Sequence, residues 1–146
     1  MASKKEGLIM QGIINATDVR KDWGNFIDHV VRFKPSLVKR NRDYLAAISL
    51  EHLEALLAPY KLTLEYDQEE DGSFSGSFKE IDIVANAASL EALKTELTKD
   101  LIEYAQDYMN EFDLYYGAPN RKPHFPYIMR VLIQKNEAAV RGLLDA

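Results

Sequence analysis

The side chains that could act in catalysis are scattered along this sequence. None of the three histidines has a carboxylate or a second histidine at the spacing of a zinc site; they are His29, His52 and His124. Serines alternate between Ser73 and Ser77, but no neighbouring base could activate a hydroxyl. The glycines form no phosphate-binding loop. These patterns predict a protein that is not an enzyme and that has no catalytic residue, metal or other cofactor.

An acidic cluster contains the carboxylates closest to a metal-binding pattern. It comprises Asp67, Glu69, Glu70 and Asp71. Its spacing differs from that of a calcium loop, which has acids at alternate positions and a glutamate at the twelfth position. Because Asp71-Gly72 is a strong turn signal, the cluster is more typical of a solvated hairpin tip, with a metal site as the alternative.

Charge is distributed unevenly along the chain. Residues 1–60 carry nine Lys and Arg against seven Asp and Glu, a net charge of +2, whereas residues 61–146 carry nine against sixteen, a net charge of −7. The basic residues near an expected helix start and an expected turn could contact phosphates and base edges: Arg20, Lys21, Lys39, Arg40 and Arg42. The alternative is a solvated surface on which nearby acids are their partners: Asp18, Asp22 and Asp43.

Aromatic residues recur along one expected helix and just beyond it. Tyr104, Tyr108 and Phe112 follow its apolar stripe, and Tyr115 and Tyr116 lie where the stripe ends. A helical aromatic stripe is typical of a core, but such rings also stack on bases or line a groove that binds a partner. We take Tyr108, Phe112, Tyr115 and Tyr116 as the candidate partner-binding residues.

The elements that would position the basic residues follow from the apolar pattern of the first part. A short strand is expected at Ile13-Ile14, and a helix with Thr17 as its cap runs to Pro35. The apolar face of this helix comprises Val19, Trp23, Phe26, Ile27 and Val30. Residues 36–40 and 44–50 predict a hairpin, with Asn41 in the left-handed conformation at its turn. A second helix is expected at 50–57, with an apolar face of Leu50, Leu53, Leu56 and Leu57.

The second part predicts a small antiparallel sheet followed by helices. Residues 61–67 and 73–78 alternate between apolar and polar types around the Asp71-Gly72 turn, and residues 81–84 could add a third strand. Ser89 is expected to cap a long helix that reaches Phe112 and ends before Gly117. In the closing segment, 127–144, the second half is expected to be helical.

Length and composition place these elements in a folded α+β protein. The 146 residues suffice for one domain or two very small modules, and a boundary is expected near Pro59 and Tyr60 without a flexible linker. We therefore predict a strand–helix–hairpin–helix head, 1–60, packed with a second part, 61–146, that contains a small antiparallel sheet and C-terminal helices. The absence of cysteine, of a long apolar run and of a secretory signal at 1–7 favours a cytoplasmic protein without membrane contact.

Residues 12–57 resemble antitoxins of the Phd/YefM family. The segment Ile13-Ile14-Asn15-Ala16-Thr17-Asp18-Val19-Arg20 looks like that family's short strand and Ser/Thr-x-x-Arg helix start. Residues 38–42 are similar to its hairpin, and residues 46–56 to its second strand and helix, although Asn41 replaces the usual turn glycine and Tyr44 a small apolar residue. The resemblance implies a symmetric dimer that meets operator DNA through Thr17 and Arg20 at the helix start and through the basic turn.

Residues 64–93 look instead like the sheet and helix of HicB antitoxins. This likeness rests on Glu70-Asp71-Gly72-Ser73-Phe74-Ser75-Gly76-Ser77-Phe78 and Ser89-Leu90-Glu91-Ala92-Leu93, whereas residues 81–86 lack the Pro and Gly typical of HicB proteins. By analogy, this part would bind the toxin.

The two resemblances predict an antitoxin of a type II toxin–antitoxin system. It would bind and neutralise a protein toxin, a small basic ribonuclease that complements the acidic second part, and repress its own operon as a homodimer or higher even oligomer on operator DNA. One alternative is a dimeric protein-interaction module without DNA binding. Another is an enzyme or small ligand-binding domain that uses the acidic hairpin and Tyr115-Tyr116.

Overall fold

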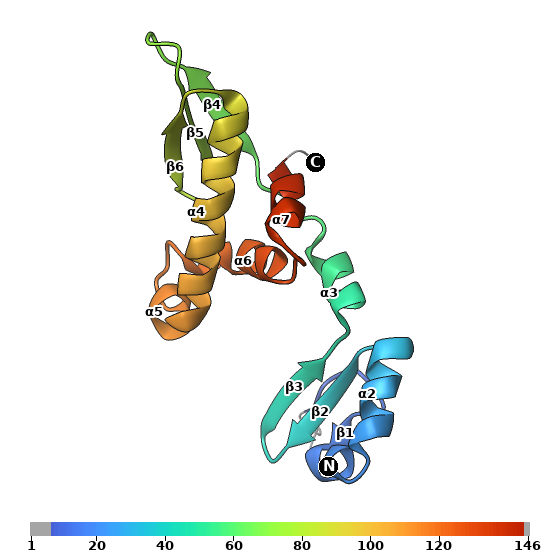
Figure 1. The fold of residues 1–146 in the computed structure, drawn as a ribbon. Coiled ribbons are helices and arrows are strands. Elements are labelled where there is room, and N and C mark those ends of the chain that lie inside the picture. The colour runs from blue at the N-terminus through green and yellow to red at the C-terminus, as the bar shows by residue number, and fades with distance from the viewer. Residues whose placement is uncertain (1–6, 145–146) are drawn as a thin grey trace. The chain divides into compact units, whose positions relative to one another are not determined.

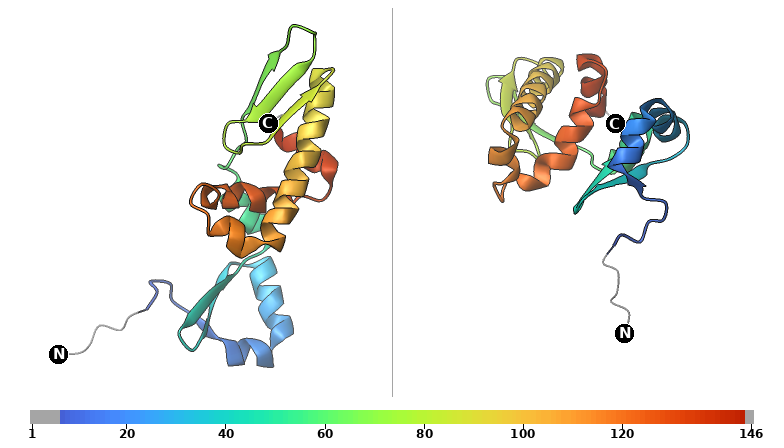
Figure 2. Two further views of the ribbon diagram at one scale, coloured as in Figure 1. Left: turned by 90° about the vertical axis from the view of Figure 1, so that its left-hand side faces the viewer. Right: turned by 90° about the horizontal axis from the view of Figure 1, so that it is seen from below.

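The computed structural model describes residues 7–144 and divides the chain into two compact units. The N-terminal unit comprises residues 1–55 and the C-terminal unit residues 56–146. The boundary falls inside helix α3 (Leu50–Leu57), shortly before the position expected from the sequence. Each unit has its own three-stranded sheet and its own apolar core, which confirms the α+β fold class (Figures 1 and 2).

The N-terminal unit packs two helices on a sheet of order β1-β2-β3. Strand β1 (Ile14–Asn15) runs parallel to β2 (Ser36–Arg40), which pairs antiparallel with β3 (Asp43–Ala47). Helices α1 (Ala16–Lys21) and α2 (Trp23–Arg32) lie between β1 and β2 in the chain. The core of this unit is a cluster of buried residues from both helices and β2: Val19, Phe26, Val30 and Val38.

Asp22 interrupts the single helix predicted from Thr17 to Pro35. Its backbone has φ −136° and ψ 57°, so α1 ends before it and α2 starts after it. The Asp22 carboxylate accepts a hydrogen bond from Asn25 Nδ2 at 2.8 Å, a local bond of the kind that competes with helical backbone pairing, and Gly24 weakens the helix further. The break turns Trp23 out of the core, and its expected burial was wrong because the side chain is 59% exposed.

The two other expectations for helix ends and turns in this unit have opposite outcomes. Asn15, and not Thr17, occupies the N-cap position of α1, so Thr17 lies inside the helix. Asn41 has φ 54° at the turn between β2 and β3, as predicted. Because Arg40 pairs with Asp43, the turn has two residues, and Asn accepts the left-handed conformation more readily than most residues.

The apolar face predicted for α3 is largely exposed. Leu57 is buried, but Leu50 and Leu56 are not. The Ser49 hydroxyl accepts a hydrogen bond from the His52 backbone N–H at 3.1 Å, which satisfies one of the free amides at the start of this helix.

The C-terminal unit packs a long helix, α4 (Leu90–Asn110), on one face of an antiparallel sheet of order β4-β5-β6 (Figure 1). The strands are β4 (Leu64–Gln68), β5 (Phe74–Phe78) and β6 (Val84–Ala87). The third strand was expected at 81–84, but it starts at Val84. Ile81 is instead a core residue in the loop that precedes this strand. At Gly76 an added Cβ would lie 2.8 Å from Leu93 Cδ2, so glycine allows α4 to approach β5 closely.

Four short helical segments complete the C-terminal unit. Helix α4 is capped by the Ser89 hydroxyl, as predicted, but it ends at Asn110. Helix α5 (Phe112–Tyr116), a 3-10 turn (Lys122–His124), α6 (Phe125–Leu132) and α7 (Glu137–Leu144) follow. Helices α6 and α7 pack on α4, so both halves of the closing segment are helical. Within residues 7–144, no helix combines the length and apolar character that crossing a membrane requires.

Candidate functional site

The parallel pairing of β1 and β2 brings the two basic segments of the N-terminal unit to one end of its sheet. Asn15 pairs with Lys39, and both strands run in the same direction. Helix α1 begins directly after β1, and the Asn41-Arg42 turn follows directly after β2 (Figure 1). The start of α1 and the turn therefore lie at the carboxyl end of these strands, which we call the basic end.

The predicted DNA-binding residues at the basic end are mostly exposed. Lys39 is half-buried, with its ammonium 5.5 Å from the centre of the Tyr44 ring, and it lines a shallow hollow with Arg42. Arg20 lines another hollow beside Trp23. The remaining candidates are exposed: Thr17, Lys21 and Arg40. The structure thus groups Lys39 and Arg42 around one hollow and places Arg20 at a second.

The acids near the basic end do not neutralise these cations. In the part of the chain that the structure describes, none of the five forms an ion pair with a carboxylate. Asp22, next to Lys21 in the chain, instead accepts a hydrogen bond from Asn25. The cations of the basic end are therefore available to an external anion.

An apolar stripe runs along the outward face of α2. Its residues recur every fourth position, and they are Trp23, Ile27 and Val31. Ile27 was expected on the core face of the helix, and this was wrong because it is 38% exposed; Val31, which was not assigned to that face, is 52% exposed. A stripe of large apolar side chains left in water marks a surface that another protein can cover.

The predicted partner-binding aromatic residues form a packed cluster at the carboxyl end of α4. Tyr108 is 0% exposed and its hydroxyl donates a hydrogen bond to the Arg121 carbonyl oxygen at 2.8 Å, so it cannot contact a partner and that expectation was wrong. Phe112, Tyr115 and Tyr116 are half-buried. Tyr115 stacks on Tyr108, and Phe112 stacks on Tyr116, so these rings pack mainly against one another within the unit.

A hydrogen-bonded triad closes this cluster. Arg121 Nη1 donates to the Tyr104 hydroxyl at 2.9 Å, and that hydroxyl lies 2.7 Å from His124 Nδ1. Burial is the main cause that raises the pKa of Tyr104 and lowers the pKa of His124, whereas the hydrogen bond to Tyr104 raises the pKa of Arg121. The lowered pKa favours the neutral imidazole of His124, whose Nδ1 shares a hydrogen bond with the Tyr104 hydroxyl in a direction set by the imidazole tautomer.

The acidic hairpin tip supports its own turn. The Asp71 carboxylate accepts hydrogen bonds from the Ser73 hydroxyl at 2.6 Å and from the Ser73 backbone N–H at 2.9 Å, and these bonds lower the pKa of Asp71. Within residues 7–144, no three carboxylates or histidines come together as metal ligands would. The tip is thus a solvated turn.

The comparisons with known proteins identify the class to which the chain belongs. A family model described as "PHD_like: Antitoxin of toxin-antitoxin, RelE / RelB, TA system" matches residues 10–146. This chain belongs to that antitoxin family. One model spans both units, so the C-terminal unit is part of the family pattern and not an addition to it.

A solved structure supports the same assignment for the antitoxin. It is described as an antitoxin part of a proposed toxin–antitoxin system from Syntrophomonas wolfei subsp. wolfei, and it is 44% identical to this chain. The match covers 91% of this chain and 96% of the other, with a TM-score of 0.85. A comparison with curated proteins found no match. The antitoxin is therefore a regulatory protein and not an enzyme, and its partner is a cognate toxin.

Sequence reasoning missed two groups of residues in the antitoxin. The stripe of Trp23, Ile27 and Val31 was hidden because a single continuous helix would have turned Trp23 and Ile27 inward. Arg121 was not considered and His124 was examined only as a zinc ligand, because their partner, Tyr104, lies far from them in the chain. The signal for the first group was present, since Asp22 and Gly24 both disfavour a helix interior.

Proposed function

We propose that the antitoxin binds operator DNA as a two-fold dimer and thereby represses its own operon. The contacts assigned to phosphates and base edges are the residues of the basic end: Thr17, Arg20, Lys21, Lys39, Arg40 and Arg42. Two observations support this proposal. The start of α1 and the β2–β3 turn lie at one end of the sheet, and within residues 7–144 none of the cations of α1 and the hairpin has a carboxylate partner. Cations in this arrangement gain affinity by releasing counterions from DNA.

The dimer would use the exposed stripe on α2. Covering Trp23, Ile27 and Val31 with the same stripe of a second copy removes apolar surface from water, and two-fold symmetry places two basic ends on one palindromic operator. This arrangement corresponds to the Phd/YefM-type head, 12–57, that the sequence resembles.

We further propose that the C-terminal unit holds and neutralises the toxin in the cytoplasm. Residues 61–146 carry a net charge of −7, which favours a basic partner such as a small ribonuclease and speeds its association. Among the aromatic residues assigned to this role, Phe112, Tyr115 and Tyr116 keep partly exposed rims. Toxin binding here is the role that the HicB-like resemblance implies.

The DNA-binding proposal is tested by titrating the full chain with DNA that carries the promoter of its own operon. We expect Arg20→Ala and Arg40→Ala each to weaken binding by about tenfold, because a lost base-edge or phosphate contact costs roughly 1–3 kcal/mol. Arg32→Ala is the matched control, since Arg32 ends α2 at the opposite end of β2 from the turn and is exposed. Equal affinity for all four proteins, with unchanged melting temperatures, would contradict the assignment.

A further inference from the structure

The free edge of strand β4 has backbone hydrogen-bonding groups that are not paired with any other backbone group among residues 7–144. β4 is an edge strand whose strand partner is β5. The hydrogen bonds from Glu69 N–H to Ser73 O and from Lys79 N–H to Thr63 O fix the phase of this antiparallel ladder. Because hydrogen-bonded pairs alternate, residues 65 and 67 turn their N–H and C=O groups toward β5, and residues 64, 66 and 68 turn theirs outward. An incoming strand could pair with those three.

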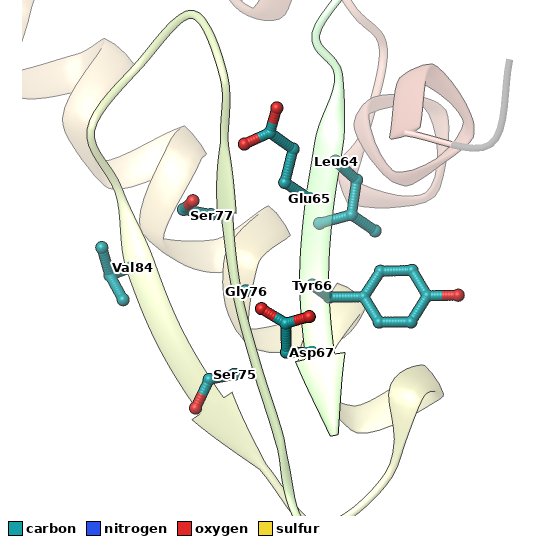
Figure 3. A pocket seen from close by; sticks show the side chains of 8 residues that line it. All are labelled: Leu64, Glu65, Tyr66, Asp67, Ser75, Gly76, Ser77 and Val84. Atoms are coloured by element: carbon teal, nitrogen blue, oxygen red, sulfur yellow. The ribbon is translucent and has the colours of Figure 1, made fainter. Parts of the chain in front are cut away.

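Two hollows flank this edge on the two faces of the sheet. Leu64 and Tyr66 line both of them. Tyr66 Cβ lies 3.2 Å from the position of an added Gly76 Cβ, which itself faces Leu93 of α4, so Tyr66 and Leu64 are on the helix side. Figure 3 shows both side chains extending past β4, away from β5. On the helix side the hollow also has an apolar lining: Leu62, Leu90 and Leu144.

The opposite face beside the same edge is acidic. Glu65 and Asp67 project from it, next to Ser75 and Ser77 of β5 (Figure 3). The helix-side hollow, by contrast, includes Lys61 and Lys94 in its lining. An added strand would therefore meet carboxylates with every second side chain, and apolar groups bordered by lysines with the others.

A second copy of this chain is a poor occupant of the edge. If two β4 strands paired antiparallel about Tyr66, Glu65 of one copy would lie opposite Asp67 of the other. If they paired about Glu65 or Asp67, an acid would face an acid again. Like charges directly opposite each other destabilise a strand pair. Pairing between two β4 strands is therefore unfavourable, and the edge favours a strand with basic side chains.

We infer that β4 receives an extended segment of the cognate toxin as a fourth strand of the sheet. This inference rests on the proposed toxin-binding role of the C-terminal unit. The toxin strand alternates basic with apolar side chains, so that Lys or Arg face Glu65 and Asp67 while apolar residues face Leu64 and Tyr66. Backbone pairing supplies the affinity, and the alternation supplies the specificity.

Hydrogen exchange followed by NMR tests the inference on the unmodified antitoxin, with the product of the adjoining reading frame as the toxin. We expect the amides of residues 64, 66 and 68 to exchange fast in the free antitoxin and slowly in the complex, whereas 65 and 67 are protected in both. A complex that forms while 64, 66 and 68 stay unprotected, or in which protection appears around 112–116 instead, overturns the β4 site and leaves toxin binding intact. Failure of the complex to form refutes the proposed toxin-binding function itself.

A charge-reversal pair gives an independent test. The double variant Glu65→Lys/Asp67→Lys should weaken toxin binding by tenfold or more. The matched control, Glu96→Lys/Glu103→Lys, makes the same change in net charge on the exposed surface of α4 and should bind within about twofold of the unmodified chain. Equal losses in the two variants would show that only overall charge matters and would overturn the site.

Discussion

His124 is the residue whose protonation the C-terminal unit resists most clearly. The residue is 7% exposed, and its Nδ1 lies within hydrogen-bond distance of the Tyr104 hydroxyl, at 2.7 Å. Burial lowers its pKa below the ordinary value of 6.5, the Arg121 guanidinium acts in the same direction, and Asp82 opposes both. Protonation of the imidazole would place a second cation beside the Arg121 guanidinium in a buried site.

We predict that the antitoxin loses stability below pH 6.5 through this group. The unfolded chain binds the His124 proton more tightly than the folded chain does, so the stabilisation is complete above pH 6.5 and is lost as the pH falls through the lowered folded pKa. Denaturant unfolding between pH 8 and pH 5 should show a shallower decline in the free energy of unfolding for His124→Asn than for the unmodified chain. Parallel curves would mean that His124 does not contribute.

We predict that Gly76 in β5 does not tolerate a side chain. A Cβ there would lie 2.8 Å from Leu93 Cδ2 and 3.1 Å from the Glu65 carbonyl oxygen, and the latter cannot move without disturbing the ladder. Gly76→Ala should lower the free energy of unfolding by about 1–3 kcal/mol, as overpacking does. Gly142→Ala, in α7 with open space around it, should be neutral or raise it by up to about 1 kcal/mol. The account is contradicted if both variants unfold at the same denaturant concentration.

At the scale of elements, helix α2 has one face in the core and an opposite apolar face in water. Phe26 and Val30 face the core, while Trp23, Ile27 and Val31 remain in water. We predict that Ile27→Lys separates the proposed dimer into monomers at micromolar concentration, because a charge in an apolar interface is costly to desolvate. Sedimentation velocity measures this directly.

The neighbouring residue provides the control for the dimer. Asp28 is exposed on the same helix outside the stripe, so Asp28→Lys should leave the sedimentation coefficient unchanged. A dimer that survives Ile27→Lys would assign the contact to another surface of the antitoxin.

The order of elements could be predicted because their apolar periods are clear. The β2–β3 hairpin and the Ser89 cap follow from residue types alone. The helix breaks at Asp22 and Glu111 could not be predicted in this way. The three-to-four residue period of apolar residues continues across both positions, whereas the helical backbone conformation ends there. Ile81 illustrates a third limit: a β-branched residue fits a strand and a buried loop equally well, and only packing against α4 decides between them.

At the scale of the whole molecule, the chain separates opposite charges between its parts. Residues 1–60 carry a net charge of +2 and residues 61–146 a net charge of −7. An acidic part would repel DNA phosphates, so the proposed DNA contact is assigned to the basic end. The same acidity would favour a basic toxin. In the proposed function, one chain therefore binds two partners of opposite charge on different surfaces.

The candidate sites differ in how far the sequence alone could locate them. The elements of the basic end were predicted, but the parallel pairing of β1 with β2 that brings the start of α1 to the same end of the sheet as the turn was not. The β4 edge was not, since an edge strand and a central strand of a small sheet have similar residue patterns. The aromatic stripe was ambiguous, and burial of Tyr108 assigned it largely to the core.

The salt dependence of binding to its own promoter DNA tests the central claim about the antitoxin most directly. If the basic end meets phosphates, log Kd rises linearly with log salt concentration, and Arg40→Ala reduces the slope by about 1 for one lost phosphate contact. Binding that is independent of salt, or a slope that Arg40→Ala leaves unchanged while Arg32→Ala reduces it, would contradict the account.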